Sequence, residues 1–235
     1  MVVVDPKIFA RTERLLLRPL RLEDAEDILL MRKHPEVMIH TPILPSDDID
    51  STKAWIQGVS TCLFLTCTST HANSPQCHQV EENWNFSIVL LEPHDGPRVI
   101  GLIGAVRAPE IGYMFNASYW GYGYATEALR AFMPLFFGHY SGRDIADYKP
   151  EELKRIVSNG HAKNGNGNYG HRNGVDTLAP RYDYAEAHTD PELVSSQKVL
   201  MKVGFRLHEK KEGDFENPVL GTRDTLVYRM YRSAL

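Results

Sequence analysis

The sequence has little cysteine, no excess of basic residues and no long hydrophobic run. Its 235 residues include three cysteines, and an odd count without regular spacing favours free thiols over a disulfide framework. Lys and Arg number 26 against 30 Asp and Glu, so the chain lacks the positive charge that binding to nucleic acid requires. The longest apolar run, residues 99–106, is far shorter than the roughly 18 residues of a membrane-spanning helix.

These absences favour a soluble, cytoplasmic protein whose partners are neither nucleic acid nor a membrane. The N-terminus becomes acidic at Asp5, before the apolar core of a signal peptide can form. Hydrophobic residues make up 43% and charged residues 24% of the chain, which is close to the average of globular proteins. Disorder of the whole chain, a collagen-like repeat and a coiled coil are therefore excluded.

The three cysteines and two histidines gather in one short segment. Such a group could in principle hold zinc, but it lacks the paired C-x-x-C spacing of structural zinc sites. One end of the segment is apolar, and the rest is rich in Ser, Thr, Asn and Pro. We therefore predict no metal site among these residues: Cys62, Cys67, His71, Cys77 and His78.

Hydrophobic periodicity predicts a mixture of strands and helices, with a meander of neighbouring antiparallel strands in the middle of the chain. The expected strands are residues 12–18, 84–91, 99–107, 111–115, 183–189, 205–211 and 222–231. The expected helices are residues 22–33, 50–59, 126–137 and 150–158, and one that starts at Pro191 after an Asp190 N-cap and ends at Gly204. The expected irregular segments are a mobile Gly/Asn-rich loop at 158–176 and an acidic turn at 212–216.

A glycine-rich turn connects the strand at 111–115 with the helix that follows it. The turn reads WGYGYA from Trp120 to Ala125, with small residues at alternate positions. This pattern lets backbone N–H groups point into one concavity at a helix N-terminus, where the helix dipole adds positive potential. The turn therefore predicts an anion site, most simply for a pyrophosphate. A turn without a ligand is the alternative, because the G-x-G-x-x-G and GK[ST] motifs are absent.

Two sequence strings and the order of the elements resemble the GNAT acyltransferase superfamily. The strings are IGYMFNASYWGYGYATEAL, residues 111–129, and DPELVSSQKVLMKVGF, residues 190–205. The resemblance covers about residues 12–231 and is greatest to the branch that contains the ribosomal-protein alanine N-acetyltransferases. It implies an α/β protein of the α+β type, with a mixed, mostly antiparallel sheet of six to seven strands. The sheet would be splayed at its fourth strand, Ile111–Phe115, and flanked by helices.

The resemblance also implies acetyl-CoA as co-substrate and an amine as acceptor, either a protein N-terminus or a small molecule. The backbone of Met114 and Phe115 would bond the pantetheine chain like an added strand. A homodimer is left open. The N–H groups that would hold the pyrophosphate of CoA belong to Trp120, Gly121, Tyr122, Gly123, Tyr124, Ala125 and Thr126.

Two positions depart from the family pattern. Leu193 stands where the family often has Asn, and Leu200 stands where it often has the tyrosine that acts as general acid. Ser196 is the expected replacement acid, since helical spacing puts it on the same apolar stripe as Val199 and Leu200. A bond from this hydroxyl to its own helix backbone is the structural alternative.

The expected general base is one of two residues. Strand periodicity puts Tyr184, Glu186 and His188 on one face of their strand. His188 matches a position at which relatives carry a base, and an imidazole is suited to accepting a proton from an ammonium group. Glu110, directly before the fourth strand, is the rival candidate, and a His188 that only caps or packs is the structural alternative. Glu127 is interpreted as an acid that complements the helix dipole.

We therefore expect an N-acetyltransferase that moves an acetyl group from acetyl-CoA to a primary amine by direct attack. Ser196 would protonate the leaving thiolate, and His188 or Glu110 would accept the proton of the amine. A non-catalytic acyl-CoA-binding module is the alternative, which the two leucines favour. The chain is expected to form one domain over residues 1–235, with insertions at about 62–82 and 138–182.

Overall fold

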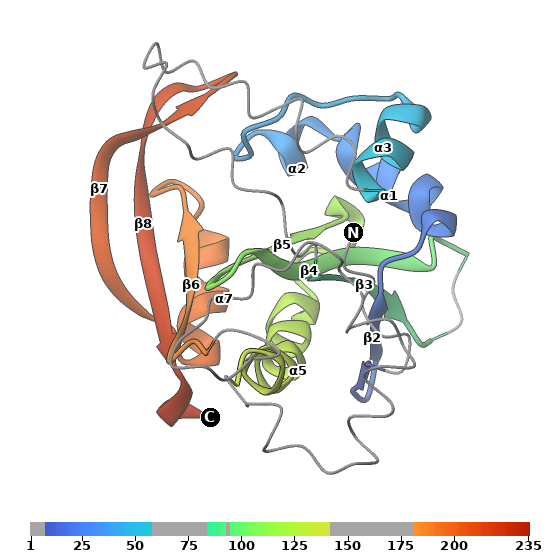
Figure 1. Ribbon diagram of the computed structural model, residues 1–235. Helices are drawn as coiled ribbons and strands as arrows, with labels where there is room; N and C mark the ends of the chain where they lie inside the picture. The colour runs from blue at the N-terminus through green and yellow to red at the C-terminus, as the bar shows by residue number, and fades with distance from the viewer. Residues whose placement is uncertain (1–7, 58–83, 93–94, 142–180) are drawn as a thin grey trace, which may run out of the picture.

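A mixed β-sheet with helices on both faces forms the core of the protein (Figure 1). The structure, a computed structural model, describes residues 8–57, 84–92, 95–141 and 181–235. Over these residues the sheet has eight strands in the order β1-β2-β3-β4-β5-β6-β8-β7. The expected fold class is confirmed, and the additional strand is the two-residue β1.

The elements lie where hydrophobic periodicity places most of them. The strands are β1 (Ala10–Arg11), β2 (Leu15–Pro19), β3 (Trp84–Leu90), β4 (Val99–Arg107), β5 (Glu110–Phe115), β6 (Tyr184–Thr189), β7 (Arg206–Asn217) and β8 (Gly221–Tyr231). The α-helices are α1 (Ala25–Arg32), α2 (Pro35–Met38), α3 (Ile49–Ile56), α5 (Tyr124–His139) and α7 (Val194–Val203). Short 3₁₀ turns cover Leu22–Asp24, Ala117–Tyr119 and Arg232–Ala234.

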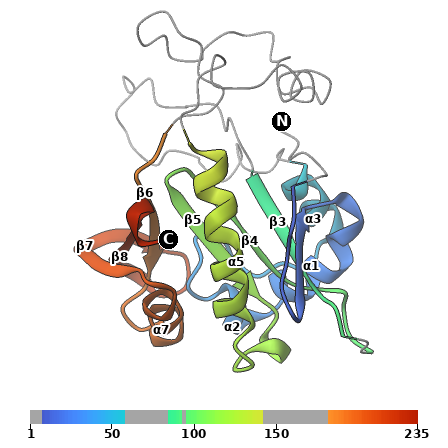
Figure 2. The same cartoon turned by 90° about the horizontal axis from the view of Figure 1, so that it is seen from below.

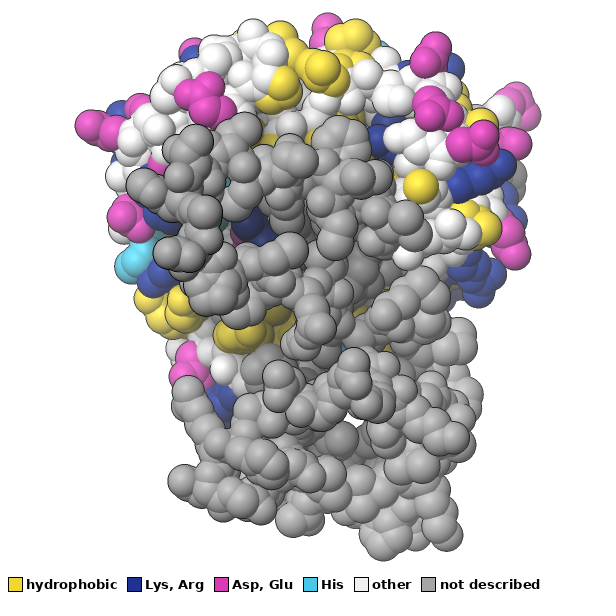
Figure 3. All heavy atoms as spheres, turned by 45° about the horizontal axis from the view of Figure 1, so that its top comes forward, with side chains coloured by type: hydrophobic (Ala, Val, Ile, Leu, Met, Phe, Trp, Pro, Cys, Tyr) yellow, Lys and Arg dark blue, Asp and Glu magenta, His cyan; other side chains and the backbone are white. Residues whose placement is uncertain are grey.

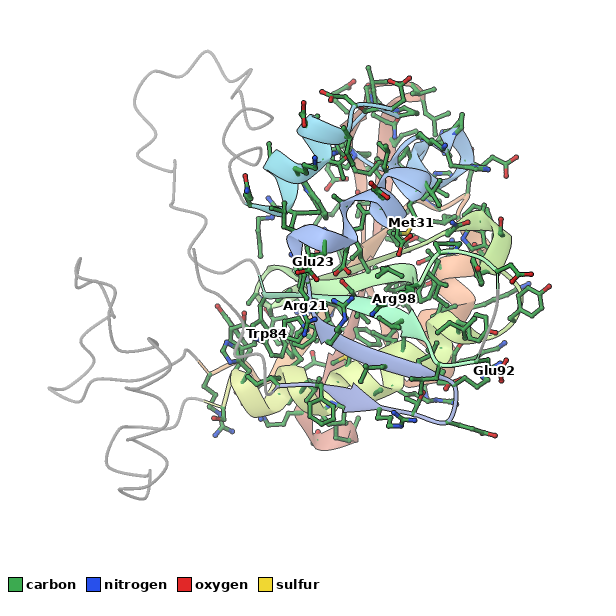
Figure 4. The ribbon with its side chains drawn as sticks, turned by 90° about the vertical axis from the view of Figure 1, so that its right-hand side faces the viewer. Arg21, Glu23, Met31, Trp84, Glu92 and Arg98 are labelled. Atoms are coloured by element: carbon green, nitrogen blue, oxygen red, sulfur yellow. The ribbon has the colours of Figure 1, made fainter. Side chains whose placement is uncertain are left out.

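The helices divide between the two faces of the sheet. α5 and α7 cover one face, and α1 to α3 lie on the other (Figures 1 and 2). The larger hydrophobic core joins the sheet to α5 and α7 and includes Trp84, Phe132 and Leu200. The smaller core packs α1 against β3 and β4 and includes Met31 and Val99. Figure 4 labels one member of each core, Met31 on α1 and Trp84 at the start of β3.

The strands β5 and β6 are parallel neighbours that pair over only two residues. Glu110 lies opposite Glu186, and Ile111 lies opposite Ala187. Beyond these pairs β5 continues to pair with β4 as far as Phe115, but no longer with β6. The two halves of the sheet therefore diverge along β5, as Figure 1 shows, and the predicted splay is confirmed.

The start of α7 differs from the expectation. The helix begins at Val194, and Asp190 does not cap it. The Asp190 carboxylate instead accepts hydrogen bonds from Arg223 Nε (2.9 Å) and Nη2 (3.0 Å) and from the Glu192 N–H (2.7 Å). Two hydrogen bonds from the charged Arg223 side chain on β8 are stronger than a bond to a neutral backbone N–H at the start of the helix. The end of α7 is as predicted, with Gly204 in the left-handed region at φ 115°.

Two irregular segments also differ from the expectation. The acidic residues 212–216 lie within β7, because the hairpin turns later, between Asn217 and Gly221. The Asn217 side chain accepts hydrogen bonds from the N–H groups of Val219 and Leu220, both at 2.8 Å, and so builds that turn. The short helix α2 begins at Pro35, in a segment for which the sequence analysis predicts neither a helix nor a strand.

Several predictions concern residues outside the described part of the chain. They are the cysteine and histidine segment, the helix at 150–158 and the Gly/Asn-rich loop, together with all of the expected insertion at 62–82 and most of that at 138–182.

On the face seen in Figure 3, charged side chains of both signs are interspersed over the described surface. None of the described helices is long and apolar enough to cross a membrane.

A buried ion pair connects α1 with the sheet. Arg18 on β2 donates two hydrogen bonds to the Asp24 carboxylate, at 2.8 and 2.6 Å, and the Ser87 hydroxyl of β3 donates a third at 2.6 Å. Burial alone would raise the pKa of Asp24, but these donors hold it below its ordinary value of 3.8. Asp24 therefore stays ionised at neutral pH and fixes the start of α1.

Asp24→Asn is expected to lower the free energy of unfolding by roughly 3–5 kcal/mol at pH 7, because it leaves the Arg18 charge buried without its counter-ion. Because the folded-state pKa is lowered, this stabilisation is lost as the pH falls below about 4. The difference between the two proteins should therefore shrink in acid. Urea unfolding over a pH series measures it, with Asp50→Asn on the exposed surface as the control. Equal stability at pH 7 would contradict this role of Asp24.

Candidate active site

The glycine-rich turn presents backbone N–H groups at the start of α5. Gly121 and Gly123 have φ angles of 83° and 84°, in the left-handed region that favours glycine. A Cβ at Gly121 would meet no atom within 4 Å, so the turn faces open space. The first helical bond runs from the Glu127 N–H to the Gly123 carbonyl at 3.1 Å. The N–H groups of residues 124–126 therefore have no acceptor within the helix and can bind an anion.

A salt bridge supports this turn from behind. Glu127 on α5 binds Arg14 through Nε at 2.8 Å and through Nη2 at 2.5 Å, and it accepts a bond from the Thr12 hydroxyl. Burial opposes ionisation of Glu127, but these donors lower its pKa. Arg14 also donates to the Tyr122 carbonyl at 3.1 Å and lies 4.5 Å from the centre of the Tyr124 ring. Glu127 is thus a structural partner of the turn as well as a first-turn acid.

The strand β5 turns part of its backbone toward the opening. The Asn116 N–H donates to the Ile100 carbonyl at 2.9 Å, and Met114 lies opposite Leu102 on β4. Since neighbouring residues of a strand point their backbone groups in opposite directions, Tyr113 and Phe115 direct theirs toward the gap, and Met114 does not.

Trp120 donates two hydrogen bonds near this edge of β5. Its indole N–H donates to the Phe115 carbonyl at 3.0 Å, and its backbone N–H donates to the Ala117 carbonyl at 3.1 Å. The groups directed toward the gap are then the Phe115 N–H and the N–H and carbonyl of Tyr113. Because the Trp120 N–H is bonded to Ala117, it is not available for the pyrophosphate as expected. The N–H groups of the turn that could reach an anion begin at Gly121.

A hydroxyl pair bridges β5 and α7 on the face that α5 also covers. The Tyr113 hydroxyl lies 2.8 Å from Ser196 Oγ, and either oxygen can be the donor. Burial raises the pKa of Tyr113 to about 12, and the bond to Ser196 only partly opposes this shift. The Tyr113 phenol therefore keeps its proton at neutral pH. The sequence pattern placed Ser196 on this inward stripe but gave no sign of its partner.

The position of the missing family tyrosine is part of the core. Leu200 is 1% exposed and packs in the larger hydrophobic cluster, one turn along α7 from Ser196. Leu193 lies just before α7 as its N-cap residue and offers no side-chain hydrogen bond. Of the polar groups on this stripe, the Ser196 hydroxyl is the one that meets β5.

The opposite face of the sheet holds the candidate bases. His188 Nε2 lies 2.8 Å from Glu186 Oε1, and His188 Nδ1 lies 3.7 Å from Glu110 Oε1. Arg229 donates to Glu186 at 2.6 Å, and Arg107 donates to Glu110 at 2.9 Å. Burial would raise the pKa of Glu186, but the bonds from His188 and Arg229 lower it. The two rival bases, His188 and Glu110, are thus brought together at the mouth of the gap.

A family comparison identifies the chain. A model described as "Acetyltransferase (GNAT) domain" matches residues 14–206, which include β2 to β6, the glycine turn and α7. The chain belongs to the GNAT acetyltransferase family. A relative named "Uncharacterized N-acetyltransferase p20", from Bacillus licheniformis, is 30% identical to this GNAT chain over 152 residues, which cover 62% of the chain and 75% of the relative.

Solved structures share the fold of this GNAT domain. A GNAT-family acetyltransferase from Bacillus anthracis has a TM-score of 0.59 at 19% identity, covering 95% of this chain and 98% of that one. The ribosomal-protein-S5-alanine acetyltransferase from Vibrio fischeri has a TM-score of 0.53 at 14% identity, covering 96% and 97%. The Microcin C7 self immunity acetyltransferase MccE, solved with acetyl-CoA and AMP, has a TM-score of 0.55 at 13% identity, covering 94% and 93%.

The GNAT turn provides a direct test of anion binding. Gly123→Val is expected to abolish CoA binding, because a β-branched residue is strained at a φ of 84° and would crowd Arg14, whose Nη2 lies 3.7 Å from the Cβ position, so the turn would change shape. Isothermal titration calorimetry with CoA measures the loss. Gly138→Val near the end of the same helix, where a Cβ meets nothing within 4 Å, is the control. Unchanged affinity in Gly123→Val would exclude the turn as the phosphate site.

Proposed function

We propose that this GNAT protein transfers an acetyl group from acetyl-CoA to a primary amine by direct attack. The observation that carries the proposal is the gap between β5 and β6. It has a hydroxyl pair, Tyr113 and Ser196, on one face and an imidazole, His188, on the other. The amine would attack a thioester held in the gap from one face, and the thiolate would leave toward the other. Family membership and the anion-facing turn support this assignment.

The chain's own backbone would hold acetyl-CoA, which supplies the reactive thioester. The N–H groups of residues 121–126 fit the pyrophosphate, since they lie at a helix N-terminus in a turn that is open at Gly121. The open backbone of Tyr113 and Phe115 fits the amide groups of pantetheine in the manner of an added strand. Fixing both reactants in the gap reduces the entropic cost of bringing them together and accounts for much of the rate.

Ser196 and Tyr113 would supply the proton that the leaving thiolate needs. As the carbon–sulfur bond breaks, the Ser196 hydroxyl donates to the sulfur and takes a proton in turn from Tyr113, 2.8 Å away. Solvent returns the proton to Tyr113 before the next turnover, and the raised pKa of the phenol favours this protonated form. The pair thereby replaces the tyrosine that Leu200 displaces.

His188 would accept the proton of the attacking amine, directly or through water. It lies between the carboxylates of Glu186 and Glu110, which stabilise the imidazolium that forms. Glu110 remains the alternative base, since the cation that pairs with it besides His188 in the described part of the chain, Arg107, is 70% exposed. The acceptor is a protein N-terminus or a small amine, as both offer the free amino group that this mechanism uses.

The second candidate function is an acyl-CoA-binding module without catalysis. Leu193 and Leu200, which replace polar residues of the family pattern, favour it. It shares the turn and the open strand with the first candidate and differs only in whether bound acetyl-CoA is consumed.

Thiol release from acetyl-CoA with a panel of amines and N-terminal peptides tests the two functions. We expect turnover with at least one acceptor, and we expect Ser196→Ala to lower kcat by more than about tenfold with CoA affinity unchanged. Tyr113→Phe should lower kcat in the wild-type background and add little in Ser196→Ala, because the two hydroxyls act in series. Ser195→Ala, its exposed neighbour, is the control. Tight CoA binding without turnover on any acceptor would establish the module instead.

The pH dependence of kcat/KM distinguishes the two bases. If His188 is the base, kcat/KM falls in acid as the imidazole is protonated. His188→Gln should then lower the maximum value of kcat/KM (the plateau) and remove its decrease at low pH (the acid limb). Glu110→Gln should keep the limb and change the plateau less, because the His188–Glu186 bond stays intact. A retained acid limb in His188→Gln, together with its loss in Glu110→Gln, would move the role to Glu110.

A further inference from the structure

A buried arginine on α1, Arg32, has no carboxylate within hydrogen-bond distance among residues 8–57, 84–92, 95–141 and 181–235. Arg32 is 3% exposed, and one guanidinium nitrogen donates to the Thr52 hydroxyl of α3 at 2.9 Å. Its Nε is buried without a hydrogen-bond partner in the described part of the chain. The ring of Trp55 lies 5.9 Å away, and Asp48 acts on the guanidinium only at longer range. The charge is thus desolvated and incompletely paired.

The contrast with Arg18 shows how unusual this arrangement is. Arg18 is also buried, but it binds both oxygens of Asp24 and a backbone carbonyl. Buried arginines are as a rule paired in this way, because an unpaired desolvated charge is costly. The cost at Arg32 is therefore expected to have a functional reason, which its surroundings indicate.

Arg32 lines a pocket of about 330 Å³, a volume suited to a small molecule or a single side chain. The wall is apolar on one side, with Ile43, Leu44 and three prolines, one of which is Pro218 from the β7–β8 hairpin. Two hydroxyl residues, Ser46 and Ser51, line it as well. The pocket thus combines one cation, two hydroxyls and an apolar wall.

The loop that lines the pocket, residues 42–46, is held at its start by the ends of β6 and β7. Asn217, at the end of β7, donates to the Ile39 carbonyl at 2.8 Å, just before the loop begins. His40 lies 3.5 Å from the Asp190 carboxylate, which directly follows β6. The loop, the hairpin and the end of β6 are therefore one connected structure on the α1 face of the sheet.

We propose that this pocket binds an oxyanion, a carboxylate or a phosphate, that is carried on an apolar body. The guanidinium of Arg32 would pair with the oxyanion, the two serine hydroxyls would add hydrogen bonds, and the prolines and aliphatic residues would contact the apolar part. The proposal does not depend on acetyl transfer, since the pocket and the gap between β5 and β6 share no residue.

Three probes of similar shape test the proposal on the full chain, in the absence of acetyl-CoA. Phenylacetate and phenyl phosphate carry the anion, and phenylacetamide is the neutral control. We expect calorimetry to show that at least one anion binds more than about tenfold tighter than the amide, because a hydrogen bond to a charged group is the strong kind. Tighter phenylacetate assigns the pocket to carboxylates, and tighter phenyl phosphate assigns it to phosphate esters.

Arg32→Leu should remove the preference for the anions without lowering the melting temperature, since it deletes a poorly paired buried charge. Lys33→Leu, which removes one exposed charge next to it, should keep the preference. Should Arg32→Leu fail to fold, Arg32→Lys serves instead and should reduce the preference, because an ammonium cannot form the planar fork. The proposal is overturned if the wild-type protein does not distinguish the anions from the amide, or if either Arg32 variant distinguishes them as well as the wild type.

Discussion

The incomplete pairing of β5 with β6 is the constraint on which the rest of the structure depends. After the pairs at Glu110 and Ile111, β5 has backbone groups along one edge that none of the eight described strands satisfies. Backbone donors and acceptors need partners, so an open edge inside a sheet is a place for a ligand with its own amide groups. Trp120 satisfies one of these groups, the Phe115 carbonyl, and leaves the neighbouring ones directed toward the gap. The splay thus leaves a strip in the middle of the molecule, and we propose that acetyl-CoA binds there.

The same divergence gives the site two chemically different faces. Along β5, Tyr113 points to the face of α7 and meets Ser196, whereas Glu110 points to the opposite face and lies near His188. The proposed proton donor and the proposed proton acceptor therefore lie on opposite faces of the sheet, which is an arrangement suited to acyl transfer from a thiol to an amine. The Arg14–Glu127 pair connects the strand region before β2 with the turn at the start of α5, and so supports the proposed phosphate site.

Much of this architecture follows from local pattern, and the remainder from long-range pairs that leave no local trace. The meander of β3, β4 and β5, the turn and the helix after it are predictable because alternation and glycine placement act over a few residues. The partner of Ser196 is not, since Tyr113 lies 83 residues earlier, and neither is the partner of Glu127, since Arg14 lies 113 residues away. At Asp190 the local pattern and the long-range contact disagree. The neighbouring residues are typical of a helix N-cap, but the Asp190 carboxylate binds Arg223, which lies 33 residues later. The orphaned Nε of Arg32 likewise becomes visible only when α1 and α3 are packed together.

Amide hydrogen exchange along β5, followed by NMR with and without CoA, tests the central claim most directly. The account predicts that the Tyr113 and Phe115 amides exchange more than about tenfold slower when CoA is bound, because their N–H groups face the gap. The Met114 amide, which faces β4, should exchange slowly in both states and serves as an internal reference. If CoA binds and the Tyr113 and Phe115 amides exchange at unchanged rates, the open edge of β5 is not where the thioester arm lies.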